Sequence, residues 1–319
     1  MLARLLSVAG VCVVLAGNGA AAPVFPAKPV RFLVGYAPGG GADVLARLIA
    51  RRLSESWSQP MVVENRSGAG GTIAAGVVAK APPDGHTLIL ITSNHTVPSS
   101  EYTLTYDPVR SFAPLIEAAY IPSALMAGPS IRVASVKELI ELARAKPGAL
   151  NYGSSGTASA QYMDMQLLMQ VAGIRMTNIT YKGAAPTLVA MLSNEVQIAL
   201  APITAYLEAI RSGKVKALAV TGQVRSRLLP DVPTYSEIPA LRGFEGSANW
   251  YGIVAPAGTP RAIVGKVHDD VVAALGSPEI QRGLAEQGFI VVAGSPGEFG
   301  KRIASDVLNW EKIAKSLGR

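Results

Sequence analysis

This sequence contains almost no cysteine. Of its 319 residues one is cysteine, Cys12, and it lies in an apolar run near the start of the chain. The rest of the chain therefore has no thiol for a disulfide framework, a cysteine nucleophile or a thiolate metal site. Histidine is also scarce, with three residues, none of them in the H-x-x-x-H spacing of a helical metal site. No metal and no other cofactor is therefore expected.

Charged residues are few, and they form no long cluster of one sign. They make up 16% of the chain, which argues against disorder, while hydrophobic residues make up 49%. The formal net charge is +7, but no run of Lys and Arg is longer than Arg51-Arg52, and aromatic residues are not interleaved with basic ones. This pattern indicates a basic, solvated surface with a mild preference for anionic small molecules, and no nucleic-acid partner is expected.

The first residues have the order of charge, apolar run and small residues that marks an export signal. Arg4 precedes the apolar run Leu5–Ala16, and small residues follow at 19–22. A membrane span would need roughly 20 apolar residues, and no later stretch reaches that length. We therefore expect residues 1–22 to be a signal peptide and the rest to be an exported, soluble protein of a length typical of two domains.

Short apolar runs alternate with amphipathic helical windows along the rest of the chain. Capping signals support the helices, as where Ser135 and Glu138 precede the window Val136–Ala145. The alternation predicts an α/β fold with mainly parallel sheets flanked by helices. The expected strands are Val30–Val34, Met61–Glu64, Thr87–Ile91, Leu150–Gly153, Val196–Leu200, Ala217–Val220, Tyr251–Val254 and Phe289–Val292.

The chain divides naturally into thirds. Its first and last thirds are expected to form one lobe, residues 27–125 plus 226–319, and the middle third, residues 126–225, a second lobe inserted between two crossover segments.

A glycine-rich turn stands out within Phe32–Arg47. An apolar strand breaks at Gly35, crosses three glycines and re-enters a helical pattern near Val44. Such a strand–turn–helix junction exposes backbone N–H groups and favours a small anion. Similar turns occur at Gly153–Ser159 and Tyr181–Pro186. Two such turns, one from each lobe, would clamp a small carboxylate.

Several alternatives compete with this interpretation. The turn is not a dinucleotide fingerprint, because Val44 stands where the last glycine should be, and no Gly-Lys-Ser/Thr follows for a P-loop. Asp43 is expected to be a helix N-terminal cap, or else a partner for a ligand ammonium or an anchor for bound water. Lys182 is either a surface lysine or a carboxylate partner.

A hydrolase is the alternative from a different class. Gly153–Thr157 is similar to a nucleophile elbow, but Thr157 replaces the second glycine. A secreted hydrolase using Ser154 or Ser155 with His95 would still be compatible with the residue types present.

Motifs along almost the whole chain resemble those of one family. The matching segments are Phe32–Arg47, Glu64–Gly71, Lys80–Leu88, Tyr106–Pro114, Asn151–Ser159, Thr180–Gly183, Leu229–Thr234 and Trp250–Pro260. In this order they resemble the Bug-type periplasmic solute-binding proteins of tripartite tricarboxylate transporters. The resemblance implies a two-lobed type II binding protein, located in the periplasm and not an enzyme, that closes on a small carboxylate-bearing molecule. Membrane transport subunits would be its partners, and the chain would be a monomer.

The resemblance also implies a set of ligand-binding residues. They are Tyr36, Ala37, Gly39, Gly40 and Asp43 in the first lobe, and Ser154, Gly156, Thr157, Ser159 and Tyr181 in the second. The sequence departs from the family pattern at Tyr162 and Gln166, where the family often has His and Glu, and at two acidic positions within Val196–Ala201 that are neutral here. A module that presents its ligand to a membrane sensor, and not to a transporter, is the other binding function that fits.

Overall fold

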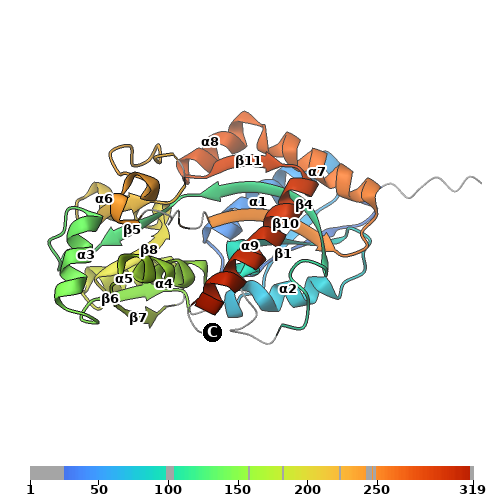
Figure 1. Ribbon diagram of the computed structural model, residues 1–319. Coiled ribbons are helices and arrows are strands. Elements are labelled where there is room, and N and C mark those ends of the chain that lie inside the picture. The colour runs from blue at the N-terminus through green and yellow to red at the C-terminus, as the bar shows by residue number, and fades with distance from the viewer. Residues whose placement is uncertain are drawn as a thin grey trace, which may run out of the picture.

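The chain folds into two α/β lobes that lie side by side, each built on one sheet (Figure 1). This computed structural model describes residues 25–97, 104–156, 159–181, 183–222, 224–241, 246 and 249–316. The predicted signal peptide, together with Thr157 and Lys182, lies outside these residues. Within them, none of the helices combines the length and apolar character that crossing a bilayer requires.

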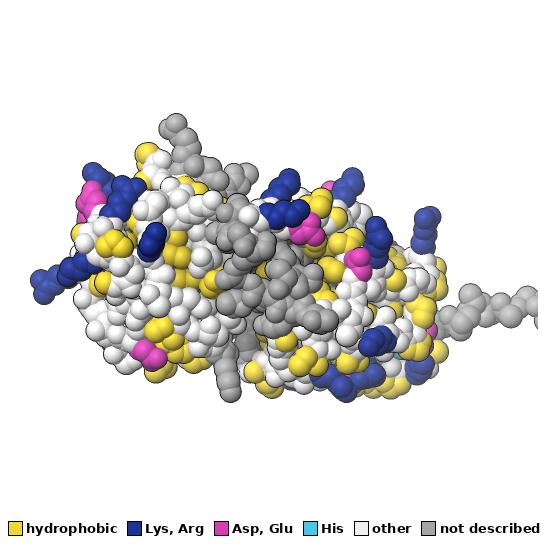
Figure 2. Space-filling model, turned by 60° about the horizontal axis from the view of Figure 1, so that its bottom comes forward, with side chains coloured by type: hydrophobic (Ala, Val, Ile, Leu, Met, Phe, Trp, Pro, Cys, Tyr) yellow, Lys and Arg dark blue, Asp and Glu magenta, His cyan; other side chains and the backbone are white. Residues whose placement is uncertain are grey.

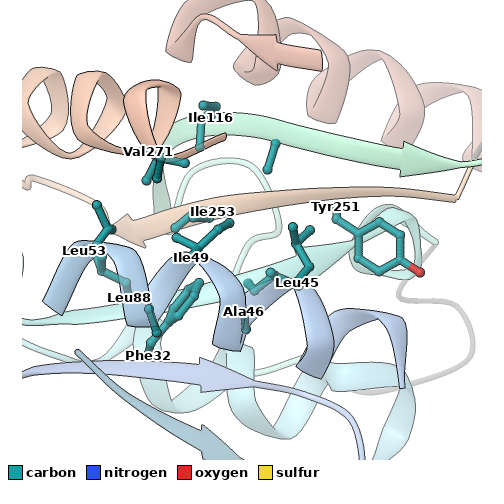
Figure 3. Close-up of a cluster of buried hydrophobic side chains, with 14 of the residues drawn as sticks. Phe32, Leu45, Ala46, Ile49, Leu53, Leu88, Ile116, Tyr251, Ile253 and Val271 are labelled. Carbon is teal, nitrogen blue, oxygen red and sulfur yellow. The ribbon is translucent and has the colours of Figure 1, made fainter. Parts of the chain in front are cut away.

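The first lobe has a six-stranded sheet of order β11-β4-β10-β3-β1-β2. Its strands are β1 (Val30–Val34), β2 (Met61–Asn65), β3 (Thr87–Thr92), β4 (Phe112–Ile121), β10 (Asn249–Pro256) and β11 (Ile290–Gly294). Its helices are α1 (Gly41–Trp57), α2 (Thr72–Ala79), α7 (Arg261–Leu275), α8 (Pro278–Glu286) and α9 (Pro296–Ser316), with the 3-10 turns η1 (Ala69–Gly71) and η2 (Ser93–Thr96). Leu45 and Ile49 of α1 and Phe32 of β1 belong to the core of this lobe, where Ile49 lies near Phe32 (Figure 3).

The second lobe has a five-stranded sheet of order β7-β6-β8-β5-β9. Its strands are β5 (Ser123–Ala127), β6 (Asn151–Ser154), β7 (Thr177–Thr180), β8 (Ile198–Pro202) and β9 (Lys216–Val220). Its helices are α3 (Val136–Ala145), α4 (Ala160–Ala172), α5 (Ala184–Leu192) and α6 (Leu207–Arg211), with η4 (Ile203–Tyr206). The turns η5 (Tyr235–Glu237) and η6 (Pro239–Leu241) follow β9.

The two-lobed α/β fold is confirmed, but the expectation of mainly parallel sheets is wrong. The eight expected strands form within two residues of their predicted bounds, whereas β4, β5 and β7 were not expected. Among the strands of the described residues, β1 pairs in parallel with β2 and β3, and β6 pairs in parallel with β7 and β8. The pairs that involve β4, β5 or β10 are antiparallel. The sheets are mixed because these strands carry the chain out of one lobe and back into it.

Two crossover segments connect the lobes. The chain leaves the first sheet at Ile121 and enters the second at Ser123, with one proline between them, and it returns between β9 and β10. The two segments are bonded to each other, because the Ser123 amide donates to Thr221 Oγ1 at 2.9 Å and the Thr221 amide donates to the Ser123 carbonyl at 2.9 Å. The crossovers therefore form one paired joint.

Helix α9 spans both lobes (Figure 1). Near its start, Arg302 lies 3.4 Å from the Glu117 carboxylate of β4, and Asp306 accepts a hydrogen bond from Trp250 Nε1 at 2.8 Å. Burial raises the pKa of Glu117 and of Asp306. Near its end, Trp310 packs in the core of the second lobe. The helix thus ties the crossover strands to the second lobe.

The packing of α9 on β10 leaves no room for a side chain at Gly252. A methyl group there would overlap the Phe299 ring and lie 2.8 Å from the Ile116 carbonyl oxygen. The Phe299 ring is fixed edge-on against Trp250, with ring centroids 5.3 Å apart. We expect Gly252→Ala to destabilise the protein by about 1–3 kcal/mol, seen as a lower melting temperature.

The matched control is Gly265→Ala in α7. No atom lies within 4 Å of the added methyl group there. Alanine is favoured over glycine in a helix by about 0.5–1 kcal/mol, so this variant should melt at the same temperature as the parent or higher. Equal melting temperatures for the two variants would contradict the packing account.

Candidate functional site

The first predicted loop lies between β1 and α1, at the carboxyl end of a parallel strand, where α/β proteins generally bind ligands. Ala37, Gly39 and Gly40 are exposed, and Gly39 has a φ of +83°, which favours glycine. Gly40 is the N-cap of α1, and among the residues that the structure describes no side chain caps this helix. The amides of the first turn therefore have neither an intrahelical acceptor nor a side-chain cap, as an anion site requires.

Asp43 supports this loop from inside. The prediction that it caps α1 is wrong, because Gly40 holds that position and Asp43 stands three residues later. Its buried carboxylate accepts hydrogen bonds from the Gly39 amide at 3.0 Å, Arg47 Nε at 2.9 Å and Asn65 Nδ2 at 2.8 Å. Burial by itself would raise the pKa of Asp43, but these bonds outweigh it and hold the pKa below its ordinary value. The Gly39 amide is thus engaged within the protein.

Tyr36 anchors the start of the same loop. Its hydroxyl lies 3.0 Å from the Gly70 carbonyl and 2.6 Å from Thr92 Oγ1, which in turn lies 3.3 Å from the Asn94 amide nitrogen. A carbonyl can only accept and an amide N–H can only donate, so the chain of donation runs from Asn94 through Thr92 and Tyr36 to Gly70. Burial raises the pKa of Tyr36, so the phenol remains protonated.

The second predicted loop connects β6 to α4. Ser154 is buried, and its Oγ accepts a hydrogen bond from the Gly156 amide at 3.2 Å. Gly156 has a φ of +112°, which only glycine adopts readily. Ser159 is the N-cap of α4, since its Oγ accepts from the Tyr162 amide at 3.2 Å and donates to the Gly156 carbonyl at 2.7 Å. The position of Thr157 lies outside the described residues.

Tyr181 lies beside this loop. Its amide donates to the Ser154 carbonyl at 2.9 Å, which extends the pairing of β6 and β7 by one residue. Burial, with the carboxylate of Glu195 nearby, raises the pKa of Tyr181 to about 12. The structure thus brings Ser154, Gly156, Ser159 and Tyr181 together at one end of the second sheet.

The two loops are connected through η2. Asn94 Oδ1 accepts a hydrogen bond from the Ala160 amide at 3.0 Å, and Ala160 is the first residue of α4. Thr92 connects the same turn to Tyr36. Sequence reasoning did not assign Thr92 or Asn94 to the site. The signal available was the polar run that directly follows the apolar strand β3.

A small cavity lies beside the first loop, at the carboxyl ends of β1 and β3. Its lining includes Gly35, Tyr36, Gly70, Thr72, His95 and Tyr106. No carboxylate, ammonium or guanidinium belongs to the described residues that line it. The cavity is thus uncharged, and apolar atoms make up most of its lining.

His95 does not serve as a base for Ser154 or Ser155. Its Nε2 lies 2.9 Å from the Pro108 carbonyl, so that nitrogen carries the proton, and burial lowers the pKa of His95 to about 4. The ring stacks on Tyr106, with centroids 5.9 Å apart, inside the first lobe. Across the described ranges, no group of His, Asp and Glu side chains is arranged to hold a metal ion.

Replacement of Asp43 tests its role in fixing the first loop. Because the pKa of this carboxyl is lowered in the fold, its contribution to stability is present above the ordinary Asp value of about 3.9 and is lost as the pH falls below it. We therefore expect Asp43→Asn to melt below the parent near neutral pH. The difference should shrink as both proteins are titrated to acid pH in thermal unfolding experiments.

The exposed Asp269, changed to Asn in the same way, is the matched control. If the difference in melting temperature between the parent and Asp43→Asn stayed constant as the pH was lowered, the charge of Asp43 would not be what holds the loop.

Comparison with known proteins shows the family of this chain. The family model described as the tripartite tricarboxylate transporter family receptor matches residues 45–319. Protein BugT of Bordetella pertussis is 32% identical over 320 residues, which cover 99% of this chain and 98% of that protein. A UPF0065 protein from the gbd 5' region of Cupriavidus necator is 31% identical over 301 residues, which cover 94% of this chain and 90% of that protein.

Solved structures agree with this assignment. R. palustris Rpa4515 with adipate is 36% identical, with a TM-score of 0.84, over 92% of this chain and 98% of that one. MatC from Rhodopseudomonas palustris with bound malate is 31% identical, with a TM-score of 0.81, over 91% of this chain and 99% of that one. The periplasmic binding protein BugD is 32% identical, with a TM-score of 0.82, over 92% of this chain and 99% of that one. The chain therefore belongs to the Bug-type receptor family of tripartite tricarboxylate transporters, a family of solute-binding proteins and not of enzymes.

Proposed function

We propose that this chain captures a small carboxylate between its two lobes and delivers it to the membrane subunits of a tripartite transporter. Family membership supports this proposal, as do the adipate and malate in two structures of similar fold. The observation that carries it is the uncapped start of α1, at the end of a loop that Asp43 and Tyr36 fix from inside. Residues 1–22 would direct the chain to the periplasm.

Backbone amides and hydroxyl groups would bind the carboxylate. In the first lobe the amides of the first turn of α1 are available, whereas the Gly39 amide is bonded to Asp43. In the second lobe Ser154 accepts from Gly156, so its own hydroxyl proton can be donated to a ligand. Each helix end adds partial positive charge, so the site can stabilise an anion without a buried cation.

The start of α4 offers a further donor. The Ala160 amide donates to Asn94 and the Tyr162 amide donates to Ser159. The Gln161 amide between them is the further donor that we propose for the ligand. The side-chain Oε1 of Gln161 is buried and accepts no hydrogen bond in the part of the chain that the structure describes. We include Gln161 in the proposed site because a ligand hydroxyl or amine would satisfy that oxygen.

Arginine does not neutralise the charge at the first loop. Arg47 is the nearby guanidinium, and its Nε is bonded to Asp43. On the face shown in Figure 2, Lys and Arg side chains are spread in small separate groups over both lobes. Attraction between the protein and an anion would therefore be modest at long range, and recognition would depend on short-range hydrogen bonds.

Closure would occur about the paired crossovers. The segment between Ile121 and Ser123 and the return segment from Thr221 to β10 are the covalent connections between the sheets within the described residues. A ligand bound to α1 from one lobe and to the Ser154 loop from the other stabilises the arrangement in which both contacts form. The membrane subunits would recognise this ligand-loaded arrangement.

The Gly40 position tests the first half of the site. Gly40 is exposed, has a φ of −79°, and an added methyl group would lie 3.8 Å from its nearest neighbour, the Ala37 carbonyl. The methyl group would fit the folded protein but would stand where a carboxylate approaches the amides. We expect Gly40→Ala to weaken binding of the tightest carboxylate in a panel of C4–C6 mono- and dicarboxylates about tenfold, or about 1.4 kcal/mol, by titration calorimetry.

The matched control is Gly297→Ala in the first turn of α9, where no atom lies within 4 Å of the new methyl group. The control should bind like the parent. Gly40→Ala should melt slightly below the parent, because alanine is a poorer N-cap than glycine, but it should be folded at the temperature of the titration. Unchanged affinity in Gly40→Ala would remove the start of α1 from the site.

The Ser154 loop is tested separately by combining Ser154→Ala with Thr157→Ala. Loss of two hydroxyl donors to a charged oxygen should weaken binding by about tenfold or more in the same titration. Parent-like affinity in the double variant would show that the second lobe's share of the site is assigned wrongly.

A further inference from the structure

The turn η2 belongs to the first sheet in sequence but contacts the second lobe. It follows β3 directly, and Asn94 within it accepts the hydrogen bond from the Ala160 amide at 3.0 Å. Val97, just beyond the turn, packs in the hydrophobic core of the second lobe. Ser93 Oγ lies 3.2 Å from Asn249 Oδ1, at the start of the returning strand β10. One turn therefore contacts α4 and a crossover strand at the same time.

The same turn is connected to the first ligand loop. The Asn94 amide donates to Thr92 Oγ1, which donates to the Tyr36 hydroxyl. The Tyr36 hydroxyl then donates to Gly70. The backbone amide of Asn94 thus begins a continuous hydrogen-bonded chain that ends at Gly70 in the first lobe. The side chain of Asn94 holds Ala160, the first residue of α4 in the second lobe.

From this geometry we propose that Asn94 is a positioning residue that holds the start of α4 against the first lobe before any ligand binds. This proposal rests on the proposed function, because it concerns how the two halves of that site are assembled. Asn94 would be a joint between the lobes in addition to the two crossovers. Its side-chain oxygen suits this role, since the free amides of a helix's first turn prefer such an acceptor.

The joint affects binding through preorganisation. A ligand that binds only when the two lobes are together has an apparent affinity equal to its intrinsic affinity multiplied by the fraction of molecules already in that arrangement. A side-chain bond that favours this arrangement therefore raises affinity without touching the ligand. It should slow ligand release more than it speeds capture, because most affinity changes within one interface lie in the dissociation rate.

A distance measurement tests the proposal directly. Beyond Cys12 the sequence has no cysteine, so spin labels can be attached at Lys80→Cys in the first lobe and Lys137→Cys in the second, both exposed positions. Without ligand, we expect Asn94→Ala to reduce the population with the short interlobe distance about fivefold relative to the long one. That ratio corresponds to about 1 kcal/mol, the usual net value of one hydrogen bond.

Two further variants make the result specific. Asn94→Asp keeps the acceptor and places a negative charge at a helix N-terminus, so it should retain the parent's distance distribution. Asn178→Ala, in the edge strand β7, removes an asparagine far from η2 in the sequence and should also leave the distribution unchanged.

The outcomes separate this proposal from the proposed function. If Asn94→Ala leaves the distance distribution unchanged while carboxylate binding persists, the joint is wrong and the binding function stands. If Asn94→Ala binds carboxylates more tightly than the parent, Asn94 competes with the ligand for the Ala160 amide, and the proposal is also overturned. If no carboxylate in the C4–C6 panel binds the parent, the function fails, whereas the distance measurement still decides the role of Asn94.

Discussion

Free backbone amides at the start of a helix need a hydrogen-bond acceptor. The rest of the structure depends on how this need is met at the starts of α1 and α4. At α1 no side chain supplies the acceptor, because the N-cap is a glycine. At α4 the protein supplies two, Ser159 from the same loop and Asn94 from the other lobe. In the proposed function the first helix start is the one left for a ligand, while the second is partly satisfied and joined to the first lobe.

The rest of the scaffold holds these two ends in place. Parallel strands β1 and β3 deliver the first loop and η2 to the same edge of one sheet, and β6 delivers the second loop to an edge of the other. Buried polar contacts then fix the first loop, with Asp43 bonded to the glycine turn and Tyr36 bonded to Gly70 and Thr92 of two neighbouring segments. The crossovers and α9 connect the lobes at separate places. A site assembled in this way needs few charged groups, in keeping with the low charge content of the chain.

The sequence predicted those parts of the structure that local patterns determine. Strand β3 is an apolar run and β1 is apolar apart from Arg31; they end at polar and glycine turns, and both form as expected. Strand β4 contains Pro114 and a buried glutamate, Glu117, whose partner Arg302 lies far along the chain, so its sequence does not have the pattern of a strand. Strand β7 is short, polar and at a sheet edge, and it depends on pairing with β6. The mixed character of the sheets comes from the antiparallel pairing of β4, β5 and β10, whereas β7 pairs in parallel.

The sequence predicted the candidate site only in part, as it did the fold. Glycine turns after apolar strands identified both loops, but the role of each polar side chain depends on contacts that spacing does not show. Asp43 faces Gly39, Arg47 and Asn65, so it supports the turn and does not cap the helix. Asn94 is bonded to a residue 66 positions later, which no local pattern indicates. The expectation that these loops share one ligand came from the glycine turns, and the family motifs agreed with it.

The central claim is that a small carboxylate occupies the space between the two loops, and native mass spectrometry of the purified mature protein tests it most directly. Gentle unfolding in the instrument would release any molecule carried through purification. The account predicts a single small carboxylate, bound one to one and lost in parallel with unfolding. A protein that carried no ligand, and that no mono- or dicarboxylate stabilised against heat, would contradict it.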